Sequence, residues 1–329
     1  MENNDPNEIP YILNEYLGYL STIKGKSPNT VEGYKTDLRL FIKYVYKFRN
    51  SLETPLENVC VKNVDDNFIK SITLSDIYSF IGYVNNTRHN SAAARARKTA
   101  SIRGFFNYLE NKRRLIVDNP AKDLESPKSV KRHPIYLTLD ESKDLLESVF
   151  GTVVGRNKER DFCILALFLN CGLRLSELVG INISSIKGDI LTVIGKGNKE
   201  RTVYLSPICL NSISAYLSIR VKPLPGFEDA LFLSEQRKRI NKRTVELLVK
   251  KYAEYAGLDS NKYTPHKLRH TAATLMYKHG GVDIRALQQI LGHESVATTQ
   301  IYTHIDDDQL RTAVKSNPLA NLNINIEKK

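Results

Sequence analysis

The sequence predicts a mainly α-helical protein with one small antiparallel sheet, divided into two domains. Apolar residues recur at helical spacing through residues 7–114 and again through residues 241–315. Only two short runs, residues 190–194 and 201–205, have the composition of β-strands. With 329 residues, the chain is longer than most single domains. We therefore expect two domains, of which the second contains a β-hairpin.

The first domain is predicted to span residues 1–124 and to contain four amphipathic helices. Ser27, Thr73 and Ser91 each stand at the start of an apolar periodic segment, where a side-chain oxygen can cap the first turn. The stretch of residues 48–70 is polar and is predicted to be irregular. The four helices should form a compact all-α domain.

Positive charge is dense on the fourth predicted helix and in the segment after it. Small alanines separate the charges on this helix, so its surface could approach a phosphate backbone closely. A basic face that contacts only solvent is the alternative. Residues 125–135 are polar and contain prolines, which predicts an interdomain linker. The candidate DNA-binding residues of these two segments are Arg95, Arg97, Lys98, Arg103, Lys128, Lys131 and Arg132.

The second domain is predicted to span residues 136–329. The two strand-like runs are joined by Gly-Lys-Gly-Asn-Lys-Glu, which predicts a hairpin. A third short strand is expected at residues 231–233. The helical region that begins at residue 241 should continue to about residue 315. Further helices are expected at about residues 138–150, 157–171 and 207–221.

The bulk composition narrows the class of protein. A formal net charge of +12 indicates a polyanionic partner, most commonly nucleic acid, and a soluble basic protein without such a partner is the alternative. The four cysteines form no CxxC pair, and Cys163 and Cys171 lie in apolar sequence, so we expect reduced core residues. We find no signal-peptide pattern and no apolar run of about 20 residues, the length that spans a bilayer. We expect a cytoplasmic, nucleoid-associated protein without membrane contact.

Residues suited to phosphodiester chemistry recur in short motifs of the second domain. The motifs are Cys-Gly-Leu-Arg-Leu-Ser-Glu, Gly-Lys-Gly, Pro-His-Lys-Leu-Arg-His-Thr, Leu-Gly-His and Thr-Gln-Ile-Tyr-Thr-His. No phosphate-binding loop, dinucleotide fingerprint or metal cluster competes with them. Such a set can break a DNA strand without a metal ion or a cofactor. The candidate catalytic residues in these motifs are Arg174, Lys196, His266, Arg269, His293 and Tyr302.

The two arginines are the predicted phosphate ligands. A guanidinium group is a planar fork that can hold two non-bridging oxygens and keeps its charge near neutral pH. Two such forks complement the extra charge of a pentacoordinate transition state. Glu177 follows Arg174 by three residues on an expected helix, so its carboxylate could orient the guanidinium. Ordinary surface ion pairs are the alternative for these residues.

Proton transfer would be shared among the lysine, the histidines and the tyrosine. Lys196 at the hairpin tip could protonate the departing 5′ oxygen, although spacing alone leaves Lys199 as a competitor. Tyr302 has an ordinary pKa near 10, so it needs an acceptor such as His266 to become a nucleophile. His293 could hydrogen-bond a phosphate oxygen. Because a phosphotyrosine conserves the bond energy, the set favours strand exchange or relaxation over degradation.

His266 and His270 are spaced four residues apart, which would also permit a pair of metal ligands. No Asp, Glu or Cys at suitable spacing completes a ligand set, and the charge of Arg269 would repel a cation. The sequence therefore favours a site without a metal.

These motifs resemble those of the tyrosine recombinases, specifically the Xer-type site-specific recombinases of bacteria. The resemblance implies a SAM-like core-binding domain, followed by a tyrosine-recombinase catalytic domain. It implies Lys196 rather than Lys199 as the catalytic lysine, and Tyr302 as a nucleophile that forms a 3′-phosphotyrosine. The similar stretches cover nearly the whole chain and are residues 27–41, 91–109, 171–180, 194–205, 263–274 and 291–304.

The same resemblance implies an assembly on DNA. A C-shaped clamp would hold a duplex target with two half-sites. A homo- or heterotetramer would join two targets, each protomer passing residues 313–326 to a neighbour. The implied task is resolution of chromosome dimers, often with a septal DNA translocase. Two departures from the family are a longer polar stretch at residues 48–70 and a slightly short interval from Arg174 to Lys196.

Three other functions compete with this interpretation. An integrase of a mobile element would use the same residues on a different target. A DNA-binding protein with an inert catalytic set is disfavoured because no catalytic position is missing. A type IB topoisomerase shares the chemistry, but the two-domain size and the C-terminal exchange segment fit recombination better.

Overall fold

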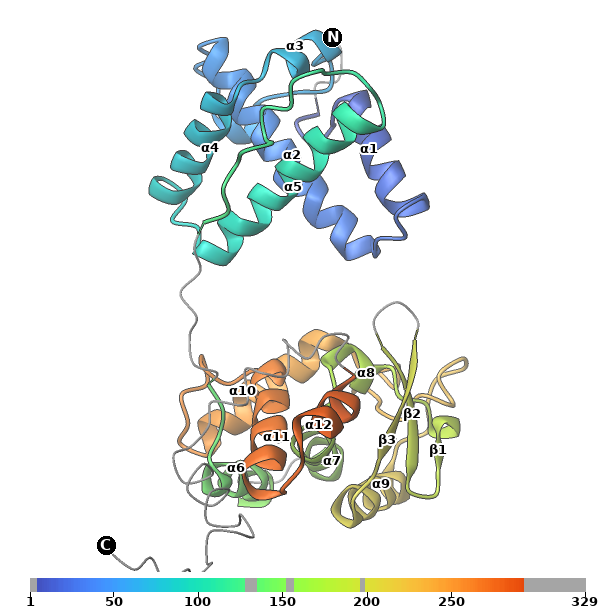
Figure 1. Ribbon diagram of the computed structural model, residues 1–329. Coiled ribbons are helices and arrows are strands. Elements are labelled where there is room, and N and C mark those ends of the chain that lie inside the picture. The colour runs from blue at the N-terminus through green and yellow to red at the C-terminus, as the bar shows by residue number, and fades with distance from the viewer. Residues whose placement is uncertain (1–4, 128–134, 152–156, 196–198, 293–329) are drawn as a thin grey trace, which may run out of the picture. The chain divides into compact units, whose positions relative to one another are not determined.

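The structure is a computed structural model of the chain, and the chain divides into two compact units, residues 1–131 and 132–329 (Figure 1). The predicted linker of residues 125–135 spans this division, and its limits stay a prediction. The structure describes residues 5–127, 135–151, 157–195 and 199–292.

The described part of the first unit is helical, and the three predicted side-chain caps begin three of its helices. Ser27 and Ser91 each accept a hydrogen bond from the backbone amide three residues later. Thr73 and Asp76 form a reciprocal capping box. These contacts satisfy amides that the start of a helix leaves without partners. The helices are α1 (Tyr11–Thr22), α2 (Pro28–Arg49), η1 (Leu56–Asn58), α3 (Asp66–Ser71), α4 (Leu74–Asn86) and α5 (Ala92–Asn111).

The prediction that residues 48–70 are irregular is correct for residues 50–55 and 59–65 but wrong for the rest of the stretch. This stretch contains η1 and most of α3, and its apolar side chains Val59, Val61, Val64 and Ile69 are buried. They follow neither a helical nor a strand period, yet they pack on the core of the unit. The described part of this unit therefore has five α-helices instead of the predicted four.

Lys98 on α5 does not have the exposure that a DNA contact needs, which corrects its assignment. Its side chain is 7% exposed, and Nζ lies 2.6 Å from Oδ1 of the buried Asp37 on α2. Removing one partner of a buried ion pair costs about 3–5 kcal/mol. Lys98 therefore ties α5 to α2, and the charge density of the helix does not reveal this structural role.

For the other basic residues, a role in DNA binding stays a prediction. Arg97 lies 2.6 Å from Oδ2 of Asp37, but its side chain is 49% exposed and so remains accessible. Arg95 and Arg103 are half-buried and donate to backbone carbonyls. Lys128, Lys131 and Arg132 lie outside the described residues.

The second unit has a helical core around α7 (Lys158–Cys171), whose side chains are buried on nearly all sides. Cys163 and Cys171 belong to this core, as predicted. Against α7 pack α6 (Leu139–Gly151), α9 (Pro207–Ile219) and α11 (Pro265–His279). The remaining described helices are α8 (Leu175–Val179), η2 (Ile183–Ser185), α10 (Lys242–Tyr255) and α12 (Ile284–Leu291).

The sheet is antiparallel, in the order β1 (Ile186–Lys187), β2 (Ile190–Ile194) and β3 (Glu200–Tyr204). β2 and β3 form the predicted hairpin. The prediction of a third strand at residues 231–233 is wrong, because Ala230 and Leu233 make only isolated bridges and β1 supplies the third strand. The apolar run of residues 231–233 reflects burial in the core, which strands and buried loops share.

The helical region predicted from residue 241 consists of α10, α11 and α12 as far as the description extends. The residues after Gly292 lie outside the described part. Within the described residues, we find no helix with the length and apolar character needed to cross a bilayer.

Candidate active site

The end of α7 places Arg174 at the site. Gly172 terminates α7 in a left-handed conformation with φ 58°, which glycine adopts without strain. A Cβ at this position would lie 2.9 Å from Cδ2 of Leu291, so the turn packs closely on α12. Arg174 then becomes the N-cap residue of α8, and its side chain is 31% exposed.

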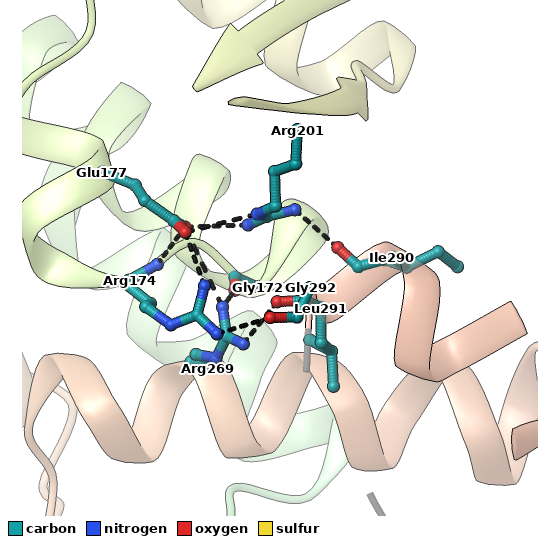
Figure 2. Close-up of polar contacts among 8 residues, drawn as sticks. All are labelled: Gly172, Arg174, Glu177, Arg201, Arg269, Ile290, Leu291 and Gly292. Carbon is teal, nitrogen blue, oxygen red and sulfur yellow. Dashed lines mark hydrogen bonds and ion pairs between the residues drawn. The ribbon is translucent and has the colours of Figure 1, made fainter. Parts of the chain in front are cut away.

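Glu177 is the buried anion around which the arginines gather (Figure 2). Its side chain is fully buried, and Oε1 and Oε2 accept hydrogen bonds from Nη1 and the backbone amide of Arg174 at 2.7 and 2.8 Å. Nη2 of Arg201 donates to Oε2 at 2.8 Å, and Nη1 of Arg269 lies 3.9 Å from the same oxygen. The predicted orienting role of Glu177 therefore has a geometric basis.

The charge of Glu177 is maintained by these neighbours. Burial raises the pKa of a carboxyl group, but the hydrogen bonds and charge of Arg201, together with the hydrogen bonds of Arg174, outweigh it and lower the pKa of Glu177 below its ordinary value. The group is therefore ionised at neutral pH, and a fixed negative charge holds the arginines in place.

Arg269 enters the same cluster from α11. Its side chain is 5% exposed, and its nitrogens donate to the carbonyl oxygens of Gly172 and Leu291, both at 2.6 Å. Because α11 packs against α7, the arginine is held between the end of α7 and the end of α12. Two arginines that are 95 positions apart in the sequence (174 and 269) thus share one carboxylate.

The C-terminal end of α12 completes the cluster (Figure 2). The carbonyl groups of its last two residues and of the C-cap residue each accept from a different arginine: Ile290 from Arg201 at 2.5 Å, Leu291 from Arg269 at 2.6 Å and Gly292 from Arg174 at 2.8 Å. The end of a helix leaves carbonyls without helical partners and carries partial negative charge, which cations stabilise. The residue that follows this end is His293.

His266 lies one turn before Arg269 on α11 and contacts His270, with 3.0 Å between the two Nε2 atoms. Burial, together with the charges of Lys267 and Arg269, lowers the pKa of His266. The ring is therefore neutral near pH 7 and can accept a proton. Among the described residues, no group of three or more His, Cys, Asp or Glu side chains is placed to bind a metal ion.

We expect His266 in the free protein to titrate below 6.5, the ordinary value for histidine. Because the fold favours the neutral ring, proton uptake below about pH 6.5 should also cost stability. A titration of the histidine ring protons by nuclear magnetic resonance measures the midpoint, and His266→Asn assigns the signal. A midpoint above 6.5 would contradict the assignment of His266 as a neutral acceptor.

A cleft of about 900 Å³ opens beside Arg174, His266 and Arg269. Its other ionisable lining residues are mostly basic, although Glu246 is acidic. A concave site of this charge suits a polyanion. The added basic lining residues are Lys242, Arg243 and Lys250 on α10.

The structure brings together four of the residues singled out in the sequence: Arg174, Glu177, His266 and Arg269. Lys196, His293 and Tyr302 lie outside the described residues, and their roles stay predictions.

Arg201 was missed by the sequence reasoning. A signal for it existed, because Arg201 and the buried Val203 are two residues apart on β3 and therefore share the face of the strand that packs inward.

Comparisons with known proteins agree with this architecture. The phage integrase family matches residues 136–309, and the N-terminal SAM-like domain of phage integrases matches residues 13–66. Tyrosine recombinase XerC of Caldanaerobacter subterraneus subsp. tengcongensis is 54% identical over 315 residues, which cover 95% of this chain and 88% of that protein. Tyrosine recombinase XerD of Proteus mirabilis is 32% identical, with 94% of this chain and 92% of that protein covered.

A solved structure shares the fold. The pre-cleavage complex of the XerH site-specific recombinase bound to difH substrate has a TM-score of 0.70 at 22% identity, with 96% of this chain and 98% of that chain covered. The expected mainly helical fold, with a SAM-like domain before the catalytic domain, is confirmed. The chain therefore belongs to the phage integrase family and is a site-specific tyrosine recombinase of the Xer type.

Proposed function

We propose that this recombinase cuts and rejoins duplex DNA through a 3′-phosphotyrosine on Tyr302, without a metal ion or ATP. One observation carries the proposal: Arg174 and Arg269 converge on the buried carboxylate of Glu177 at the wall of a basic cleft. Two guanidinium groups fixed beside such a cleft suit a phosphodiester. The proposed catalytic set is Arg174, Lys196, His266, Arg269, His293 and Tyr302, with Glu177 as a supporting residue.

The arginines act on the charge that develops at phosphorus. The phosphodiester carries one negative charge, and the pentacoordinate transition state carries two. Arg174 donates to Glu177 and Gly292, but its side chain is 31% exposed, so the remaining N–H groups of its outer nitrogens can donate to a non-bridging oxygen. Arg269 is fixed by backbone carbonyls beforehand. Cations that are held in place before the reaction need no reorganisation when the charge appears. They therefore stabilise the transition state more than the ground state.

Two proton transfers accompany the exchange of bonds. The oxygen of Tyr302 bonds to phosphorus while its proton passes to the neutral imidazole of His266. The bond to the 5′ oxygen breaks, and that oxygen leaves with a proton from Lys196. His293 donates a hydrogen bond to a non-bridging oxygen. The aryl phosphodiester retains the bond energy, so attack by a 5′-hydroxyl reverses the step and rejoins the DNA.

The proposed substrate is a duplex with two half-sites, to which both the helical unit and the catalytic unit bind. Arg97 is the residue of α5 whose exposure best suits a phosphate contact. The proposed assembly is a homo- or heterotetramer on two such sites, in the cytoplasm at the nucleoid. Similarity to recombinases named XerC and XerD supports resolution of chromosome dimers as the task, with a septal DNA translocase as a further partner.

Covalent capture of chromosomal DNA in the cell tests this proposal and identifies the target. We expect the captured sequence to map to one chromosomal site. A duplex with that sequence, nicked beside the cleavage position, should then trap protein on the 3′ end of the cut strand, because the short strand diffuses away. Trapping should be insensitive to a chelator, and binding should weaken steeply with salt. Attachment to the 5′ end would contradict the 3′-phosphotyrosine, and loss of trapping with the chelator would contradict cleavage without a metal ion. Capture at the attachment repeats of a mobile element would contradict the chromosomal task.

A further inference from the structure

Arg201 on β3 directs every nitrogen of its guanidinium group to a protein partner. Nε lies 3.3 Å from Oε1 of Glu177, Nη2 lies 2.8 Å from Oε2, and Nη1 donates to the carbonyl of Ile290 at 2.5 Å. Its side chain is 11% exposed, whereas that of Arg174 is 31% exposed. A bidentate contact with a carboxylate is the strongest geometry available to arginine and fixes its orientation.

The position of Arg201 sets it apart from the two arginines proposed to bind phosphate. Arg174 and Arg269 line the basic cleft, and Arg201 is not among its lining residues. Figure 2 shows Arg201 reaching Glu177 from one side, with Ile290 at the end of α12 beside it, while Arg174 and Arg269 lie below the carboxylate. The guanidinium group of Arg201 thus contacts the carboxylate that holds Arg174 without lining the cleft.

Arg201 joins three segments that are distant in the sequence: the hairpin, α8 and α12. The base of the hairpin packs on the same carboxylate, because a Cβ at Gly195 would lie 3.5 Å from Oε1 of Glu177. The end of α12 is packed more tightly, since a Cβ at Gly292 would lie 2.7 Å from Cδ of Arg201. The hairpin base therefore contacts the carboxylate, and the end of α12 has little room beside Arg201.

We infer that Arg201 is a positioning residue of the recombinase, which aligns the β-hairpin and the end of α12 around Glu177 without touching the scissile phosphate. The inference rests on the proposed function, because Lys196 follows Gly195 in the hairpin and His293 follows Gly292 after α12. Both are proposed to reach the phosphate. A displacement of about 1 Å in such groups can slow an enzyme on the order of 100-fold.

The test compares Arg201→Met and Arg201→Lys with a matched control, Arg239→Met, in the full chain. Arg239 is also a half-buried arginine of the second unit, and it holds the carbonyls of Val179 and Ile181 away from the cleft. In single-turnover cleavage of the nicked duplex, we expect Arg201→Met to be slower by about 100-fold and Arg201→Lys to recover about tenfold of that loss. DNA affinity should stay within about twofold of the parent protein, because no phosphate contact is removed.

The pH dependence separates positioning from a general loss of stability. Arg201 helps to keep Glu177 ionised, so its removal should raise the pKa of Glu177 and move the acid limb of the cleavage rate to higher pH. Arg239→Met should leave that limb in place. In free protein, Arg201→Met should also accelerate amide hydrogen exchange in α12, and Arg239→Met should not.

Three results would overturn the inference. Cleavage by Arg201→Met at the parent rate would show that the contact is dispensable, and an equal loss of rate in Arg239→Met would indicate general destabilisation. A loss of DNA affinity that matches the loss of rate would make Arg201 a phosphate ligand. The hydrogen-exchange measurement needs no DNA, so it tests the inference separately from the proposed function. Unchanged exchange in α12 of Arg201→Met would contradict the inference. A parent protein that forms no adduct with DNA would contradict the proposed function.

Discussion

Replacing Tyr302 with phenylalanine is expected to abolish the covalent attachment of the protein to DNA. The change removes a single oxygen, the atom proposed to bond to phosphorus, and no other tyrosine lies in a motif of this kind. DNA affinity should be nearly unchanged, because contacts with the phosphate backbone dominate binding. Electrophoresis of the trapped complex under denaturing conditions measures attachment, and a filter-binding assay measures affinity.

Tyr204→Phe is the matched control for this prediction. Tyr204 lies at the end of β3 with 71% of its surface exposed, and its loss should leave attachment intact. An adduct that persists in Tyr302→Phe would mean that another residue is the nucleophile. Loss of attachment in both variants would mean that the phenylalanine changes disturb the fold.

Replacing Glu177 with glutamine is expected to reduce both stability and cleavage. The side chain keeps its shape but loses the charge that Arg174 and Arg201 contact and Arg269 approaches. Removing one partner from a buried ion-pair cluster costs about 3–5 kcal/mol of unfolding free energy. Cleavage should fall on the order of 100-fold, because the arginines lose the group that orients them. Denaturant unfolding and single-turnover cleavage measure the two effects.

The pH dependence of the Glu177→Gln effect has a definite sign. The folded-state pKa of Glu177 is lowered, so its contribution to stability is present above the ordinary carboxyl pKa of about 4.3 and is lost as the pH falls through the lower folded value. The stabilities of the variant and the parent should therefore converge in acid.

Glu200→Gln is a suitable control, because Glu200 is exposed on β3 and its change should be nearly neutral. A stability difference between Glu177→Gln and the parent that persists in acid would contradict the role of the charge.

The helix starts and the hairpin were predictable from the sequence, because the residues that determine them lie within a few positions of one another. Ser27, Thr73 and Ser91 cap helices because capping depends on residues within one turn. The β2–β3 hairpin was likewise visible, since alternating strands and a glycine-containing turn lie within one short segment. His266 and Arg269 share a helical face because they are three residues apart.

The contacts that complete the site could not be predicted, because they join residues far apart in the sequence. Arg201 donates to Ile290, 89 positions away, and Arg174 donates to Gly292, 118 positions away. Lys98 shows the same limit in the first unit, since its partner Asp37 is 61 positions away. A basic helix has the same sequence pattern whether its lysine faces phosphate or a buried carboxylate. Only the folded structure shows which of the two partners the lysine has.

The central claim is that a phosphodiester bound by the arginines around Glu177 becomes esterified to Tyr302. Protease digestion of the trapped complex, followed by mass spectrometry of the peptide that remains on the DNA, tests this claim most directly. We expect a peptide containing Tyr302 whose phenolic oxygen carries the 3′-phosphate of the cut strand. A phosphate on any other residue, or a cut strand that ends in a free 3′-hydroxyl with no peptide, would contradict it.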